Sequence, residues 1–87
     1  MTVKELKNKN TKEVLNLLIK EFDIHTIERS NQYMNFFFDD DIAGALDTRN
    51  FQVSLYDNSG WPFPNGNLLS TNVVEDLMNK KIEKYLA

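Results

Sequence analysis

The first strong pattern along the chain is helical. Five apolar residues recur at spacings of three and four, which places them on one face of an α-helix. They are Val14, Leu15, Leu18, Ile19 and Phe22. Asn10 can cap this helix, with Glu13 three residues later. The pattern predicts a helix over residues 11–22. The polar run before it interrupts the pattern, so the order of residues 1–9 stays open.

Three shorter stretches have the character of β-strands, at residues 24–29, 33–38 and 51–56. In the last two, large apolar side chains alternate with others, so they point to one face of a sheet. That face carries Met34, Phe36, Phe38, Phe51, Val53 and Leu55. The opposite face carries Tyr33, Asn35, Phe37, Ser54 and Tyr56. We expect the first face to be covered by helices.

The remaining segments complete the predicted order of elements. Residues 39–50 indicate a loop or a one-turn helix capped by Asp41, and residues 57–69 a turn followed by an irregular loop. A second helix is predicted over residues 72–86, capped by Thr71 or Asn72, with acids early and lysines late. The fold class is therefore α+β: a single small domain in α-β-β-β-α order. Its three-stranded sheet is antiparallel, with two helices packed on one face.

Length and composition narrow the class of protein. A chain of 87 residues with 41% apolar residues forms one domain, which we assign to residues 1–87. It has no Cys, which excludes disulfides, thiolate nucleophiles and cysteine-ligated zinc. The first residues lack the apolar stretch of a signal peptide, and no run is long enough to span a bilayer. We expect a cytoplasmic protein with no membrane partner.

Charge is unevenly distributed along the chain. Residues 1–20 carry five Lys and two Glu, whereas residues 21–69 carry eight acids and two Arg. The acidic middle would repel phosphates, and nucleic-acid-binding surfaces are normally basic. This argues against direct contact with nucleic acid.

The sequence offers few parts for catalysis, so we predict a protein that is not an enzyme and has no catalytic residues, metal or cofactor. His25 is the only His, and three scattered Gly cannot form a phosphate-binding loop. The acids from Asp39 to Asp47 partly follow the spacing of a calcium-binding loop. Ala43 and Asn50 stand where that loop needs oxygen ligands and a bidentate carboxylate. A solvated acidic loop explains the run better.

The candidate contact residues are acidic and aromatic. Acidic loops steer basic partners, and Tyr, Phe and Trp supply contact area at little entropic cost. The predicted partner-binding residues are Asp39, Asp40, Asp41, Asp47, Tyr33, Phe37, Tyr56, Trp61 and Phe63. Whether residues 57–69 fold back over the aromatic face stays open.

These residues lead to a ranked set of functional hypotheses. The first is a protein-binding module, a small inhibitor, immunity-type or regulatory protein, whose partner is a basic or nucleic-acid-binding protein. The Asn-, Lys- and Phe-rich composition is typical of a low-GC bacterium or its phage. The alternative is a structural or assembly subunit that self-associates through a sheet edge or the aromatic face. Both a monomer and a homodimer are compatible with these hypotheses. Minor alternatives are a metal-dependent hydrolase and a sheet that stacks nucleic-acid bases.

Overall fold

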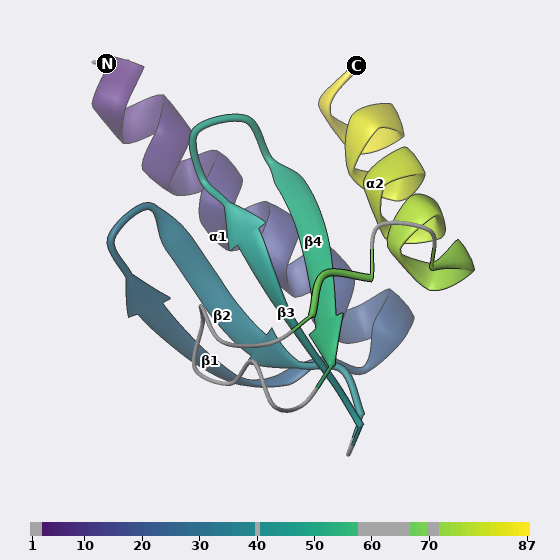
Figure 1. The fold of residues 1–87 in the computed structure, drawn as a ribbon. Helices are drawn as coiled ribbons and strands as arrows, with labels where there is room; N and C mark the ends of the chain where they lie inside the picture. Colours follow the sequence, from purple (N-terminus) through teal and green to yellow (C-terminus); the bar gives the residue numbers. More distant parts are fainter. Residues whose placement is uncertain (1–2, 40, 58–66, 70–71) are drawn as a thin grey trace.

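The chain folds as one antiparallel sheet with two helices on one of its faces (Figure 1). The computed structural model describes residues 3–39, 41–57, 67–69 and 72–87, with side chains from residue 10 onwards. The elements are α1 (Val3–Phe22), β1 (His25–Ser30), β2 (Tyr33–Phe37), β3 (Ile42–Asp47), β4 (Gln52–Asp57) and α2 (Val73–Leu86). The strands lie in the order β1-β2-β3-β4. The predicted α+β class, the antiparallel sheet and the two helices are confirmed.

The prediction of three strands is wrong, because the sheet has four. Residues 39–50 were expected to form a loop or a single helical turn, but Ile42–Asp47 forms the inner strand β3 and pairs with both neighbours. Its Ala-Gly-Ala centre has low strand propensity, so the sequence pattern did not indicate a strand there. Gly44 lies between Phe36 and Leu55, and a Cβ there would be 2.7 Å from the Phe36 ring. A small residue is therefore required where the two neighbouring strands fill the core.

Helix α1 begins earlier than predicted. The expected start at residue 11, capped by Asn10, is wrong, because the helix runs from Val3 to Phe22. No Gly or Pro occurs in this stretch, so the polar residues before Thr11 lower helix propensity without breaking the helix. Neither helix in the described part of the chain is long and apolar enough to cross a membrane.

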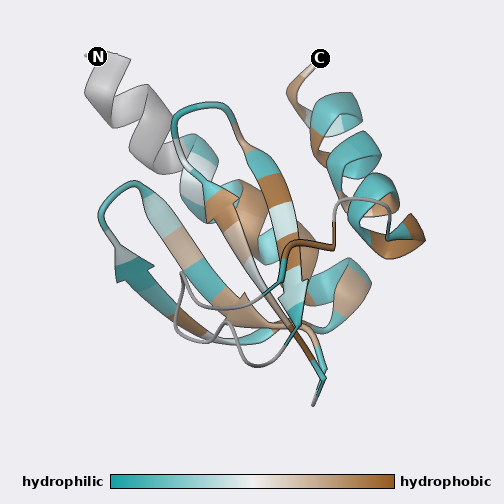
Figure 2. Cartoon of the chain, viewed as in Figure 1, coloured by the Kyte–Doolittle hydropathy of each residue, from teal (hydrophilic) through white to brown (hydrophobic). Residues whose placement is uncertain are grey.

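The core lies between the helices and strands β2, β3 and β4. Leu18 of α1, Phe36 of β2, Leu46 of β3, Leu55 of β4 and Met78 of α2 are all fully buried. Met34, Phe38 and Phe51 pack against this cluster, so the face predicted to meet the helices does so. In Figure 2 hydrophobic colours mark β3 and β4, whereas β1 is mostly hydrophilic.

The two edge strands of the sheet, β4 and β1, differ in what pairs with their outer backbone groups. On β4, the Leu55 amide donates to Glu75 Oε2 of α2 (2.7 Å), and the Leu55 carbonyl accepts from the Leu69 amide (2.7 Å). Leu68 also forms a bridge with Tyr56. On the far side, β1 is the last strand of the sheet. The β4 edge is thus closed by the chain itself, and β1 forms the other edge.

Candidate functional site

The strand register sets out the face of the sheet that carries no helix, here called the helix-free face. Direct cross-strand partners share a face. Phe37, Ala43 and Tyr56 form one row across β2, β3 and β4. Asn35, Ala45 and Ser54 form the next row, and Tyr33, Asp47 and Gln52 form the third. The predicted aromatic residues Tyr33, Phe37 and Tyr56 therefore flank a middle row of small side chains.

This middle part of the helix-free face is buried although no helix covers it. Asn35, Ala43 and Ala45 are each 3% exposed or less, while the flanking aromatic residues are partly exposed. Burial raises the pKa of Tyr56 above its ordinary value, and a hydrogen bond with Ser54 acts in the opposite direction.

Asn35 is the unusual residue of this face. Its side-chain Oδ1 is buried and accepts no hydrogen bond from the described residues. Leaving a buried acceptor unsatisfied costs about 1–3 kcal/mol, and native proteins rarely tolerate it. The sequence placed Asn35 on the face opposite the helices without deciding whether that face is covered, and the structure shows Asn35 buried between Tyr33 and Phe37 along β2.

His25 takes a structural position beside this face. It pairs with Phe37 across β1 and β2, and the two rings stack with centroids 5.9 Å apart and an interplanar angle of 27°. Its Nδ1 lies 3.2 Å from Thr26 Oγ1. Thr26 has a φ of 54°, which is rare for a β-branched residue, and it lies in an irregularity between His25 and Glu28. This bulge turns His25 onto the Phe37 ring.

The predicted acidic loop is divided by strand β3. Asp39 and Asp41 lie in the turn before β3, next to Phe37, and Asp57 pairs with the first residue of β3. Asp39 Oδ1 accepts hydrogen bonds from the Asp41 and Ile42 amides, both at 2.8 Å. Asp57 Oδ2 accepts from Asn67 Nδ2 (2.9 Å). We call Asp39, Asp41 and Asp57 the acidic end of the sheet.

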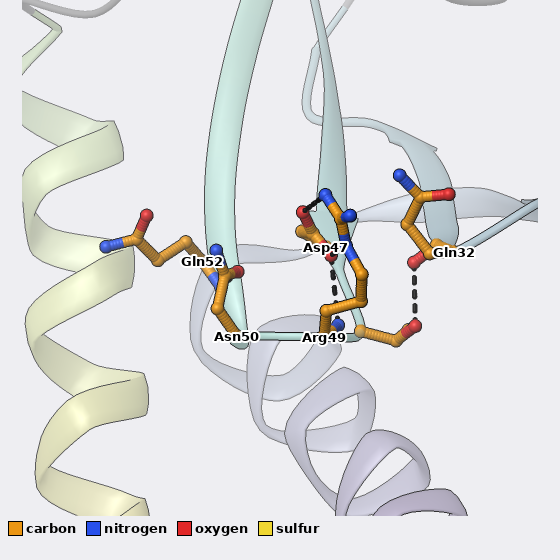
Figure 3. A network of polar contacts seen from close by, with 6 residues as sticks. Gln32, Asp47, Arg49, Asn50 and Gln52 are labelled. Carbon is orange, nitrogen blue, oxygen red and sulfur yellow. Dashed lines mark hydrogen bonds and ion pairs between the residues drawn. The ribbon is translucent and has the colours of Figure 1, made fainter.

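Asp47 lies at the opposite end of β3, near Tyr33, in the polar network of Figure 3. Its Oδ2 is 3.1 Å from Arg49 Nη2, and its Oδ1 accepts from the Arg49 amide (2.9 Å). The hydrogen bond with the Arg49 side chain holds the pKa of Asp47 below its ordinary 3.8. Thr48 Oγ1 donates to the Gln32 carbonyl (2.7 Å) and ties this turn to the β1–β2 turn. Arg49 therefore offsets the charge that Asp47 was predicted to present.

This separation excludes the calcium-loop reading of the acidic run. Asp41 and Asp47 are about 20 Å apart, because each residue of a strand advances about 3.3 Å. One ion cannot contact both. Among the described residues, no group of three His, Asp or Glu side chains is arranged to hold a metal. Three predicted contact residues, Asp40, Trp61 and Phe63, lie outside the described residues.

Comparison with known proteins yields no relative: the chain matches no family model, no curated protein and no solved structure.

Sequence reasoning missed three contributors to this region: the buried Asn35, the His25 ring and the Arg49 partner of Asp47. Asn35 had a signal, because it is an amide within the otherwise apolar and aromatic run from Met34 to Phe38. Arg49 also had one, since an acid two residues before an Arg in a turn often forms a local ion pair. The His25–Phe37 stack depends on a bulge that no local pattern indicates.

Proposed function

We propose that this protein is a non-enzymatic protein-binding module, a small inhibitor or regulatory protein that holds a partner protein against its helix-free face. The observation that carries the proposal is Asn35, whose buried Oδ1 accepts no hydrogen bond from the described residues and lies between two aromatic side chains. A partner whose contact moves the side chains around Asn35 and brings a donor to Oδ1 recovers the cost of this unsatisfied acceptor on binding.

The composition of the helix-free face supports the same proposal. Tyr33, Phe37 and Tyr56 are partly exposed and stand on rigid strands, and such aromatic residues supply much of the free energy of binding in protein interfaces. The stacked His25 ring holds Phe37 in place, so little side-chain entropy is lost on contact.

The acidic end gives the proposed partner a charge. Asp39, Asp41 and Asp57 lie beside Phe37 and Tyr56, and hydrogen bonds hold the carboxylates of Asp39 and Asp57 in place. A basic partner would be attracted to this end at long range, which speeds association at low salt. Asp47 contributes less than the sequence suggested, because Arg49 pairs with it.

Self-association is the second candidate, and the position of β1 at the edge of the sheet favours it. Unpaired edge strands are templates for another chain. The two candidates differ in their behaviour without a partner, since self-association predicts a dimer or larger species in light scattering. A monomer at every concentration would leave the partner-binding function as the sole surviving candidate.

The decisive experiment is quantitative capture of partners from host lysate with four versions of the protein. Asn35→Leu and Phe37→Ala alter the helix-free face, whereas Leu77→Ser alters an exposed position of α2 on the other side of the molecule. We expect one protein to be retained by the wild type and by Leu77→Ser, and lost with both face variants. A partner retained equally by all four versions would contradict the proposed surface, provided that circular dichroism shows each variant folded.

A further inference from the structure

A groove separates α1 from β1 on the helix-covered side of the sheet. It has a volume of about 450 Å³. Six of its lining residues matter here: Lys12, Leu15, Ile19, Ile27, Arg29 and Met34. We call it the α1–β1 groove. It lies on the other face of the molecule from the aromatic residues discussed above, so it is a separate surface.

The groove exists because the helices are held away from β1. Tyr85 of α2 donates a hydrogen bond to Glu13 of α1 (2.5 Å), and Lys81 of α2 lies 3.7 Å from Glu21 of α1. Through Glu75, α2 is fastened to β4. The helix pair is thus anchored at the β4 side of the sheet, and the apolar side of β1 is left with an incomplete cover. Ile19 accordingly remains 41% exposed.

The groove has a polarity along its length. The chain reverses between α1 and β1, so Ile19 lies toward the beginning of β1 and Lys12 toward its end. Lys12 and Arg29 therefore form a basic end, and Ile19 and Ile27 an apolar end. Neither cation joins an ion pair in the described part of the chain, where the pairs are Arg49–Asp47 and Lys81–Glu21. A ligand that matches the groove carries a carboxylate at one end and apolar groups beyond it.

The edge of β1 adds a backbone surface to this groove. No described strand pairs with its outer side. An extended segment added there would gain main-chain hydrogen bonds, and every second side chain would point into the groove. The bulge at Thr26 and the charged Glu28 and Arg29 restrict which segments can pair, as natural edge strands do to avoid unselective pairing.

We infer that the α1–β1 groove and the β1 edge bind an extended segment of a partner protein by strand addition. The groove-facing residues of that segment are an acidic side chain at the Lys12–Arg29 end and apolar side chains at the Ile19–Ile27 end. This is a second interface, opposite in charge to the acidic end of the sheet, and it does not depend on the function proposed for the helix-free face.

Other occupants fit the groove less well. A second copy that paired antiparallel through β1 would place its apolar Ile19–Ile27 end against the Lys12–Arg29 end, so the two cations would receive no acidic partner. A small anionic amphiphile matches the polarity, but small-molecule sites bury most of the ligand, and this groove leaves Ile19 open to solvent. An amphiphile also leaves the β1 edge unpaired.

The inference can be tested with defined peptides and the intact protein. The probes are two capped heptapeptides in which leucine alternates with threonine and either the first or the last leucine is replaced by glutamate. We expect one of them to shift the amide resonances of β1 and of Ile19 in nitrogen–proton spectra and to slow hydrogen exchange along β1. The same peptide with lysine in place of glutamate should bind roughly tenfold more weakly.

Charge reversal supplies the matched control. The double variant Lys12→Glu/Arg29→Glu should no longer bind the glutamate peptide and should bind the lysine peptide instead. The control Lys80→Glu/Lys84→Glu makes the same change in net charge at exposed positions of α2, and it should leave peptide binding unchanged. If the reversed variant unfolds, Lys12→Gln/Arg29→Gln tests the loss alone. Three results would overturn the inference. They are equal binding of the glutamate peptide and its lysine version, shifts of amide resonances outside the groove and β1, or saturable binding of laurate where both glutamate peptides fail.

Discussion

The side-chain amide of Asn79 on α2 forms two hydrogen bonds with the backbone of Val53 on β4. The Val53 amide donates to Asn79 Oδ1 (2.7 Å), and Asn79 Nδ2 donates to the Val53 carbonyl (3.0 Å). One side chain thus replaces the neighbouring strand that an edge residue lacks. Together with Glu75, it fastens α2 to the sheet and blocks pairing at this edge.

Replacing Asn79 should therefore destabilise the fold more than its partial exposure suggests. Asn79→Ala leaves the Val53 amide and carbonyl without partners, and we expect the free energy of unfolding to fall by about 1–3 kcal/mol. Urea unfolding measures the change. Lys80→Ala, at the next and exposed position, should stay within about 0.5 kcal/mol of the wild type. Equal effects of the two substitutions would show that the Asn79 pair contributes little.

At Asn35, removing the polar group should stabilise the protein. Asn35→Leu eliminates a buried acceptor that the described residues leave unsatisfied, and the free energy of unfolding should rise by about 1 kcal/mol. Asn35→Val repeats the test with a smaller side chain, in case leucine is too large for the space. A loss of stability in both variants would mean that the amide has a donor in the folded protein.

The Asp47–Arg49 pair should make stability depend on pH at the acidic end of the scale. Because the folded-state pKa of Asp47 lies below its ordinary 3.8, its contribution is present above that value and is lost as the pH falls through the folded-state pKa. Asp47→Asn should be less stable than the wild type at neutral pH, and the difference should vanish in strong acid. In Arg49→Gln, carbon NMR titration of the Asp47 carboxyl should show a pKa that is higher than in the wild type. An unchanged pKa would contradict the hydrogen bond with Arg49 as the cause of the lowered value.

Gly44 should not accept even one methyl group. A Cβ there would lie 2.7 Å from two atoms of the Phe36 ring and 2.8 Å from Leu55 Cδ2, and both residues are fully buried. Gly44→Ala should lower the free energy of unfolding by about 1–3 kcal/mol. In a double-mutant cycle with Phe36→Leu, the penalty for Gly44→Ala should shrink. Additive effects would indicate that the ring is not the obstacle.

Asp23 offers a simple stabilising substitution. It follows α1 with a φ of 57°, and its amide donates to the Ile19 carbonyl (3.0 Å), the position where helices favour glycine. Asp23→Gly should raise the free energy of unfolding by about 0.5–1 kcal/mol by relieving the backbone and removing an acid from the helix C-terminus. Asp23→Asn removes only the charge and should gain less. Thermal unfolding of the three proteins separates the two contributions.

Local patterns determined the elements whose physics is local. The apolar spacing of α1 and α2 and the strand alternation in β2 and β4 predicted most of the core, although Ile19 of α1 and Leu77 of α2 remain exposed. Asn72 caps α2 as one of the two expected residues, since its Oδ1 accepts from the Val74 amide (2.8 Å). Glu75, three residues after Asn72, accepts from the Leu55 amide of β4, a partner that the local pattern does not indicate.

The tertiary structure decided what depends on residues far apart in the sequence. Strand β3 could not be recognised from the sequence, because its small side chains give it low strand propensity. Those side chains are needed because Phe36 and Leu55 leave little space beside Gly44. Once β3 forms, it separates Asp47 from Asp39 and Asp41 and so divides the acidic run. Asn35 is enclosed, and the α1–β1 groove left open, by the way the sheet and helices pack. The sequence by itself therefore determined the fold class and the apolar faces, and only packing decided which polar groups remain available for a partner.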